Sequence, residues 1–500
     1  MSGGRRFVIV FVIDGLRPDA ITLEDTPTLL RLKNEGVDFP HGHAVFPTVT
    51  RVNAAALATG TQPGTNGIVG NQMYVSAVDP RRAFDTGNYR NLVRLDQATG
   101  GRVVLAETLA ERLGARGLSM AGVSSGSTGS AFLLNPRAPS GVGVLVNGHF
   151  DPGTTVAYPP DVNVTILAKF GPAPAKDGGG RYDAVVTWTQ RVLREHVLPE
   201  LRPTVVVNWL TEPDHSQHSV GVGSPDAREA LRHDDREIAR VLATLEELDL
   251  TASTDVFVVS DHGFTTNTAG VDVARDLIDA GLKASADSRD VVLASSGQAV
   301  GVHVEGHDRE RIARIARLVQ SRDWGGAVFT GGRADGDPRG VVEGTFSLEL
   351  IHVANAERSP DLLFTFPWSS RASASGVRGT DLANVSGGAK LYPSDHGSMS
   401  PWNVRNTFLA WGVDFKKRTT VRAPAGNVDV TPTILALLGI TDGDGLDGRV
   451  LREALEGGPD EEQVAVGTRV HTVEAGAYRA ALQISTTDGR RYVDKSWRMA

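Results

Sequence analysis

Three short, continuously apolar runs constrain the fold of this chain more than any other feature. The runs are rich in β-branched residues and extend from Phe7 to Ile13, from Thr204 to Leu210 and from Asp255 to Ser260. Runs of this length and composition are typical of strands that are buried on both faces of a parallel sheet. A carboxylate follows each run within a few residues. We therefore expect an α/β fold with a doubly wound, mostly parallel sheet whose site lies at the carboxyl ends of its strands.

Helix signals between these runs fit helices that flank such a sheet. Ser224-Pro225 combines a capping residue with a proline at the first helical position, and an apolar face follows it. Leucines recur every four residues from Leu105 to Leu113, which predicts an amphipathic helix over this stretch. The strand and helix signals together predict the layered architecture of an α/β protein.

The 500 residues allow several average domains or one large α/β domain with insertions. We expect the second arrangement, with a single catalytic domain over residues 1–500. Residues 265–390 mix strand-like runs with many glycines and are predicted to contain an inserted cap subdomain. Within them, Leu362 to Phe366 is a candidate strand of the main sheet. Residues 463–500 alternate weakly between apolar and polar side chains and are predicted to form peripheral strands.

Charge and composition exclude several classes of function. A net charge of −8, without any run of lysine or arginine, argues against binding nucleic acid over a broad surface. No run reaches the roughly 18 to 20 apolar residues of a membrane helix. The apolar stretch before Asp14 is too short for a signal peptide and lacks a cleavage site. We therefore expect a cytoplasmic protein without a membrane partner, and the absence of cysteine, which excludes only disulfides, fits this expectation. The sequence leaves the oligomeric state open.

Carboxylates and imidazoles gather at the ends of the predicted strands. They are Asp14 after the first run, Asp214 and His218 after the second, Asp261 and His262 after the third, and His396 late in the chain. This set contains no thiol and suits borderline divalent ions, zinc first, with manganese or iron as options. Taken singly, each residue is more often a turn or a helix cap, and only their common position favours a site. The set exceeds the needs of one tetrahedral zinc and suits two ions, with Thr50 as a further ligand.

The stretch from Thr50 to Asn71 supplies a second part of the predicted site. Thr50 precedes a helix-compatible segment, so backbone N–H groups and the positive end of the helix dipole lie beside its hydroxyl. The chain then turns through Pro63 and Gly67 and returns to Asn71, whose amide could donate to the same anion. An isolated threonine before a helix is usually an N-cap. Beside a metal-ligand set, however, Thr50 becomes a candidate nucleophile.

The order of these motifs resembles the alkaline phosphatase superfamily. The motifs are Asp14, Thr50-x-x-Asn53, Gly67-Ile68-Val69 with Asn71, Glu212-Pro213-Asp214 with His218, Asp261-His262-Gly263 and His396-Gly397. Within that superfamily the chain is most similar to the type I phosphodiesterase/nucleotide pyrophosphatase branch, over residues 7–264 and again around 390–440. The resemblance implies an alkaline-phosphatase-like fold and the hydrolysis of small phosphate or phosphonate esters, phosphodiesters first.

The resemblance also implies a division of the ligands between two metal ions, with zinc expected in both places. One ion would be held by Asp214, His218 and His396, and the other by Asp14, Asp261 and His262. Thr50 would be the nucleophile and would carry a phosphothreonine intermediate, and Asn71 would bind a phosphate oxygen. A divalent ion lowers the pKa of the water or alcohol that it binds, which would make the Thr50 hydroxyl reactive at neutral pH.

One position departs from the pattern of this branch. In this branch an aromatic residue and a proline usually stand between the nucleophile and the asparagine of the Thr50-x-x-Asn53 motif, whereas this chain has Arg51-Val52. Arg51 is therefore a candidate contact to a phosphate oxygen, and the competing interpretation is a solvated or paired arginine. The residues of the leaving-group pocket stay undetermined.

Several alternative functions remain open from the sequence. A phosphonoacetate-hydrolase-like enzyme would share the metal ligands, but no lysine lies between Lys33 and Lys169 to bind a carboxylate, although arginines in this interval could substitute. A phosphomonoesterase could use the same core. Sulfatase chemistry is disfavoured because formylglycine derives from cysteine or serine, not from Thr50. A metal-binding scaffold protein is the non-enzymatic alternative. The glycine pattern from Gly443 to Gly448 follows a helix and is rejected as a dinucleotide site.

Overall fold

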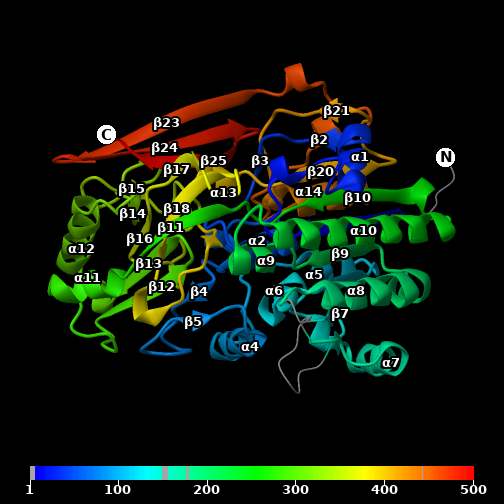
Figure 1. Cartoon of the computed structure of the whole chain (residues 1–500), viewed down its shortest axis with the longest axis horizontal. Helices are drawn as coiled ribbons and strands as arrows, with labels where there is room; N and C mark the ends of the chain where they lie inside the picture. The colour runs from blue at the N-terminus through cyan, green and yellow to red at the C-terminus, as the bar shows by residue number, and fades with distance from the viewer. Residues whose placement is uncertain (1–5, 149–155, 176–179, 442, 500) are drawn as a thin grey trace.

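A nine-stranded sheet forms the centre of the computed structural model, which describes residues 6–148, 156–175, 180–441 and 443–499 (Figure 1). Its strands, in spatial order, are β21 (Thr419–Thr420), β2 (Val37–Asp38), β20 (Phe408–Gly412), β10 (Thr254–Val259), β1 (Phe7–Ile13), β9 (Val205–Leu210), β6 (Met120–Ser124), β7 (Val144–Asn147) and β8 (Ala157–Tyr158). The five strands from β10 to β7 run parallel, and β20 and β8 are antiparallel to their inner neighbours. The expected mostly parallel α/β sheet is confirmed.

The three apolar runs form neighbouring strands in the middle of this sheet. Strand β1 pairs in parallel with β10 on one side and with β9 on the other. Its side chains alternate between two separate hydrophobic clusters, with Val8, Val10 and Val12 in one and Ile9 and Phe11 in the other. Because both faces of β1 are buried, no polar residue interrupts the run.

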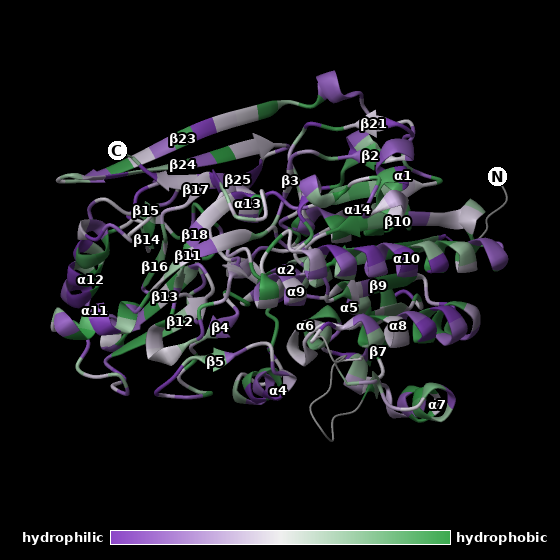
Figure 2. Ribbon diagram, in the orientation of Figure 1, coloured by the Kyte–Doolittle hydropathy of each residue, from purple (hydrophilic) through white to green (hydrophobic). Residues whose placement is uncertain are grey.

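Helices cover both faces of the sheet, as Figures 1 and 2 show. On one face lie α2 (Thr50–Thr59), α5 (Leu109–Gly114), α6 (Thr128–Leu134) and α14 (Val430–Leu437), and α4 (Tyr89–Ala98) packs outside α6. The other face packs against α1 (Pro27–Glu35), α7 (Pro160–Phe170), α8 (Asp183–Val192), a π-helix (Leu193–Leu201) and α10 (Pro225–Glu247). Ser224 caps α10 as predicted, by accepting from Ala227 N. Helix α5 begins at Leu109 rather than Leu105, because the Thr108 side chain accepts from Glu111 N and caps it.

A second, five-stranded sheet lies within residues 265–390. Its strands are, in spatial order, β12 (Val291–Ser296), β13 (Ala299–Val304), β16 (Leu362–Thr365), β14 (Val328–Thr330) and β15 (Phe346–Ser347), accompanied by α11 (Val273–Asp279) and α12 (Arg309–Ser321). Strand β16 pairs antiparallel with β13 and β14. Leu362 to Phe366 therefore does not belong to the main sheet, because its buried side chains are used in this second core. The assignment of residues 265–390 to an inserted cap subdomain stays a prediction.

A four-stranded sheet connects the main sheet to the candidate site. Its order is β17 (Ser369–Ala372), β18 (Arg378–Asn384), β11 (Thr265–Val271) and β19 (Ser394–Asp395). Strand β11 begins just after His262, which follows the main-sheet strand β10, and β19 ends just before His396. The two strands are antiparallel, with Thr265 opposite Asp395. This pairing brings His396 beside His262, although the two are far apart in the sequence.

The remaining elements are short or peripheral. They are α3 (Pro63–Asn66), α9 (Asp214–Val220), α13 (Pro401–Val404), the paired strands β3 (Gly42–His43) and β22 (Ala425–Gly426), and the paired strands β4 (Gln72–Met73) and β5 (Phe84–Asp85). At the C-terminal end, β23 (Val466–Ala475), β24 (Tyr478–Thr487) and β25 (Arg490–Arg498) form an antiparallel sheet along the upper edge of Figure 1. Among the described residues, no helix combines the length and apolar composition that a bilayer crossing requires.

Asp255 is a buried carboxylate in the central strand β10. It is fully buried, its Oδ1 accepts from Asp414 N at 3.0 Å, and its Oδ2 has no hydrogen-bond partner in the described part of the chain. Burial, reinforced by the charge of Asp414, raises the pKa of Asp255 to about 7. Since an unfolded aspartate titrates near 3.9, folding makes this carboxyl hold its proton across roughly three pH units.

The variant Asp255→Asn is expected to gain more stability at pH 8 than at pH 5. Between about pH 4 and pH 7 the folded state keeps a proton that the unfolded chain has released, so the wild type loses stability as the pH rises. Asparagine still accepts from Asp414 N but carries no charge. The gain in unfolding free energy should be about 2 kcal/mol larger at pH 8 than at pH 5. Urea denaturation of both proteins at the two pH values measures it, and equal gains would contradict the expectation.

Candidate active site

Four chain segments bring carboxylates and imidazoles together at one edge of the main sheet. Asp14 follows β1, Asp214 begins α9 after β9, Asp261 and His262 follow β10, and His396 follows β19. Among the described residues, three groups have ligand atoms within 4.8 Å of one another: Asp214, His262 and His396; His218, Asp395 and His396; and Asp14, Asp261 and His262. Six of the seven metal ligands predicted from the sequence belong to these groups, and the seventh is Thr50.

Asp395 is the one member that sequence reasoning missed. Its carboxylate Oδ1 accepts from His396 N at 2.8 Å and lies 3.8 Å from His218 Nδ1. A signal for it was present, because residues 394–397 repeat the Ser-Asp-His-Gly motif of residues 260–263. In both copies the first carboxylate oxygen accepts from the backbone N–H of the following histidine. The repeated motif therefore orients two imidazoles by the same local contact.

Asp214 lies at the centre of the cluster. Its Oδ1 is 3.4 Å from His218 Nε2, 3.5 Å from His396 Nε2 and 3.9 Å from His262 Nε2. The His262 and His396 rings stack with their centroids 3.5 Å apart. On the far side of this stack, His262 Nε2 faces Asp261 Oδ2 at 3.1 Å and Asp14 Oδ1 at 3.6 Å. The groups of donor atoms thus overlap, because His262 and His396 each belong to two of them.

The three imidazoles are fixed in one tautomer by backbone carbonyls. His218 Nδ1 lies 3.1 Å from Ser394 O, His262 Nδ1 lies 3.0 Å from Gly263 O, and His396 Nδ1 lies 3.0 Å from Thr48 O. A carbonyl oxygen only accepts, so each Nδ1 must carry the proton. Each Nε2 faces the cluster and carries the lone pair whenever its imidazole is neutral, which is the arrangement that a metal-binding histidine needs.

The carboxylates of the cluster have oxygens without hydrogen-bond partners. Asp14 Oδ1, Asp214 Oδ1 and Asp261 Oδ2 are buried and make no hydrogen bond among the described residues. Burial and the charges of Asp261 and Asp214 raise the pKa of Asp14. Burial alone would also raise the pKa of Asp214, but the imidazoles beside it, His218 first, hold it below its usual range. Unpaired buried carboxylates facing imidazole lone pairs are costly. This donor set fits divalent cations.

Thr50 lies against the same cluster. It is the first residue of α2, its side chain is buried, and Oγ1 is 3.4 Å from His262 Nε2. Val49 occupies the N-cap position, so the Thr50 hydroxyl does not cap the helix. The usual structural role of a threonine before a helix is therefore excluded here. Its hydroxyl is placed between the helix N-terminus and the carboxylate–imidazole cluster.

Asn71 and Arg51 meet beside Thr50. The Asn71 side-chain Oδ1 accepts from Arg51 N at 3.2 Å, and Asn71 N donates to Ser296 Oγ at 3.1 Å. With its oxygen engaged at the start of α2, the Asn71 amide has N–H groups to offer an anion next to Thr50. The Arg51 side chain extends towards Asp85, at 3.6 Å, which agrees with the interpretation of Arg51 as a paired arginine.

Glu212 positions the segment that carries Asp214. It is completely buried, and its two oxygens accept from Tyr182 N and from Ser216 N, each at 3.0 Å. These bonds tie the loop before α8 to the first turn of α9. Burial raises the pKa of Glu212 to about 7. Glu212 therefore supports the site from behind rather than facing the cluster.

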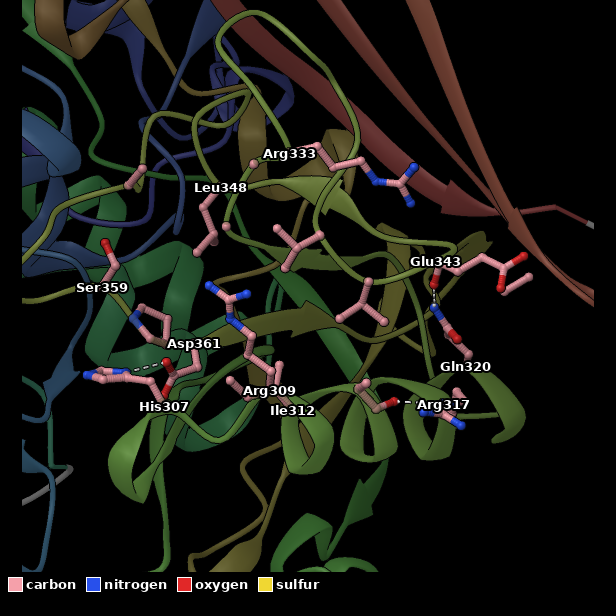
Figure 3. A pocket seen from close by; sticks show the side chains of 18 of the residues that line it. His307, Arg309, Ile312, Arg317, Gln320, Arg333, Glu343, Leu348, Ser359 and Asp361 are labelled. Atoms are coloured by element: carbon pink, nitrogen blue, oxygen red, sulfur yellow. Dashed lines mark hydrogen bonds and ion pairs between the residues drawn. The ribbon is translucent and has the colours of Figure 1, made fainter.

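A broad cavity in the accessory region is a separate feature. It measures about 1770 Å³ and lies between α12, the loop around Arg333 and the turn that joins β23 to β24 (Figure 3). Arg309, Arg317 and Arg333 are spread along it rather than converging on one point. None of the site residues predicted from the sequence lines this cavity. The candidate chemistry therefore belongs to the edge of the main sheet.

Comparison with known proteins identifies the family to which the chain is similar. A family model described as type I phosphodiesterase / nucleotide pyrophosphatase matches residues 8–375. A venom phosphodiesterase of Naja atra is 24% identical over 51% of this chain and 26% of its own length. Venom phosphodiesterase CdcPDE of Crotalus durissus collilineatus is 26% identical over 51% of this chain and 26% of its own. Ectonucleotide pyrophosphatase/phosphodiesterase family member 1 of Homo sapiens is 26% identical over 51% and 23%. The match thus spans about a quarter of the length of these relatives.

Proposed function

This chain belongs to the type I phosphodiesterase/nucleotide pyrophosphatase family, and we propose that it hydrolyses small phosphoric diesters or nucleotide pyrophosphates through a phosphothreonine at Thr50. The observation that carries the proposal is the position of the Thr50 hydroxyl. It stands at the N-terminus of α2 and 3.4 Å from His262 Nε2, inside a buried cluster of carboxylates and imidazoles. The hydroxyl therefore has the anion-binding N-terminus of a helix on one side and carboxylate and imidazole groups suited to a metal ion on the other.

We propose that the cluster holds two divalent cations, with zinc preferred and manganese or iron as options. Asp214, His218 and His396 would form one site, and Asp14, Asp261, His262 and Thr50 the other. When bound, the cations would lower the pKa of the Thr50 hydroxyl and neutralise charge on the phosphoryl oxygens. Support for bound cations comes from the orphaned oxygens of the three aspartates and from the Nε2 atoms that face them, whereas the division follows the family resemblance.

The residues of the chain would then divide the reaction into two displacements. In the first, Thr50 Oγ1 forms a bond to phosphorus, the bond from phosphorus to the leaving oxygen breaks, and the alcohol or phosphate leaves with the proton that Thr50 loses. In the second, a water oxygen forms a bond to phosphorus, the bond from phosphorus to Thr50 Oγ1 breaks, and Thr50 takes up a proton that the water gives up. Asn71 and the backbone N–H groups at the start of α2 would hold the non-bridging oxygens throughout. Phosphoryl transfer depends mainly on positioning and charge neutralisation, so these groups suffice for the protein's share.

The ratio of kcat/KM for bis-p-nitrophenyl phosphate to that for p-nitrophenyl phosphate tests the substrate class on zinc-loaded protein. We expect a ratio above about 10, because a diesterase makes use of contacts to its second ester group. A ratio well below one would instead assign the centre to phosphomonoesters, an alternative that the cationic Arg51 beside the nucleophile favours. Turnover of neither compound would contradict the proposal and make C–P bond hydrolysis the leading alternative.

A further inference from the structure

An arginine with unused hydrogen-bonding capacity stands directly after the candidate nucleophile. The Arg51 side chain is only 17% exposed, and Nη2 lies 3.6 Å from Asp85 Oδ1. Its Nε is buried and makes no hydrogen bond with any residue that the structure describes. A guanidinium carries five N–H donors in a fixed plane, and this one meets a single carboxylate at a distance longer than a hydrogen bond.

The backbone of Arg51 is fixed to the segment that presents Asn71. Arg51 N donates to Asn71 Oδ1 at 3.2 Å. The next residue, Gln72 in β4, lies opposite Asp85 in β5. Thr86 N donates to Asn71 O at 2.9 Å, so the residue before β4 is also bonded to the residue after β5. Arg51 and Asp85 are therefore fixed to the backbone that presents Asn71, one residue away from the attacking hydroxyl.

Asp85 holds this arginine weakly. Its side chain is 58% exposed, and its Oδ1 also accepts from Gly87 N at 2.8 Å. Ion pairs with one largely solvated partner contribute little, because water screens them. An anionic group of a ligand could take the place of Asp85 and meet the guanidinium with two parallel hydrogen bonds, which is the stronger geometry.

We infer that Arg51, restrained by Asp85, selects substrates whose second ester group carries a negative charge of its own, a carboxylate or a phosphate. The inference rests on the proposed function, because it concerns the group that stays on phosphorus beside Thr50. Arg51 would bind the charged group, and Asp85 is a positioning residue that competes with it. A neutral ester group would leave the Arg51–Asp85 pair in place and gain nothing from it.

Three p-nitrophenyl diesters with the same phosphorus and leaving group test this inference. Their second ester group is ethyl, 2-carboxyethyl or 2-phosphoethyl, and the two charged compounds distinguish a carboxylate from a phosphate. We expect kcat/KM for at least one charged diester to exceed that for the ethyl diester by about tenfold, mainly through KM. In Arg51→Met the ratio should fall to about one, and Arg51→Lys should keep part of it. In Asp85→Asn the ratio should rise, because the competing carboxylate is gone.

Arg82→Met is the matched control for this series. Arg82 lies in the connection between β4 and β5, close to Asp85 in the sequence, but its guanidinium pairs with Asp287 on the surface at 2.9 Å. The control should keep the wild-type ratio. An unchanged ratio in Arg51→Met would overturn the inference. An equal loss for all three diesters would overturn it as well, since it would assign Arg51 to the phosphoryl oxygens.

A binding measurement separates this inference from the proposed function. Zinc-loaded Thr50→Ala protein is titrated calorimetrically with ethyl methylphosphonate and with 2-carboxyethyl and 2-phosphoethyl methylphosphonate, none of which needs turnover. A charged ligand that binds about tenfold more tightly, with the difference lost in Thr50→Ala/Arg51→Met, supports the inference even if no diester is hydrolysed. Equal affinities, or binding of none of them, overturn it even if the enzyme proves to be a diesterase.

Discussion

Thr50→Ala is expected to lower kcat by at least about a thousandfold while changing metal affinity only a few-fold. The hydroxyl is the atom that would bond to phosphorus, so its loss removes the first displacement. Metal affinity should persist because the imidazoles are oriented by the carbonyls of Ser394, Gly263 and Thr48 rather than by the Thr50 side chain. Steady-state kinetics and the metal content of the purified variant measure the two quantities separately.

Two further substitutions serve as controls for this prediction. Thr50→Ser keeps a hydroxyl and should retain far more activity than the alanine variant. Thr59→Ala changes the last residue of the same helix, where Oγ1 donates to Ala55 O at 2.7 Å, and should leave kcat within about threefold of the wild type. Mass spectrometry of a reaction quenched during turnover should find a phosphoryl group on Thr50. Turnover of Thr50→Ala at the wild-type rate would exclude Thr50 as the nucleophile.

The main part of the candidate site was predictable because parallel strands bring their carboxyl ends to one edge. Asp14, Asp214 and Asp261 each follow an apolar run, and the sheet needs no further information to bring them together. The three central strands were predicted to within one residue of their ends because strands buried on both faces appear in the sequence as continuous apolar runs. Local pattern and general topology therefore determine most of the ligand set.

The features that sequence reasoning missed depend on contacts between distant segments. Asp395 reaches the cluster only because β19 pairs with β11, which places it opposite Thr265. Leu362 to Thr365 has the apolar character of a main-sheet strand, and only its pairing with β13 and β14 assigns it to the second sheet. A periodic pattern specifies the type of an element but not its partner.

Local capping decided two other details against the sequence pattern. The leucine spacing would extend α5 back to Leu105, but the reciprocal contacts of Thr108 and Glu111 begin the helix at Leu109. Thr50 has the residue type of an N-cap, but Val49 takes that position and frees the hydroxyl for the site. In both places the helix begins at a different residue from the one that the pattern predicts, and this changes which residue occupies the N-cap position.

Removing the bound metal is expected to abolish turnover and to lower the melting temperature by about 5 °C, with both restored by zinc. Without cations, the buried carboxylates of Asp14, Asp214 and Asp261 repel one another and have oxygens without partners. Ligands that bind only the folded state stabilise it by mass action. Scanning calorimetry before and after chelation, with metal analysis of both samples, measures the effect. A metal-free form at least as stable as the loaded form would contradict it.

Asp261→Asn separates charge repulsion from a general loss of structure on metal removal. Asp261 Oδ1 accepts from Gly15 N and from His262 N, each at 3.0 Å, and asparagine keeps both bonds. Its new N–H group would stand where Asp261 Oδ2 now lies, 3.1 Å from His262 Nε2, and could donate to that lone pair. We therefore expect metal-free Asp261→Asn to melt at a higher temperature than the metal-free wild type, while zinc stabilises it less. If the metal-free variant instead melts lower, repulsion among these carboxylates is not what the cations relieve.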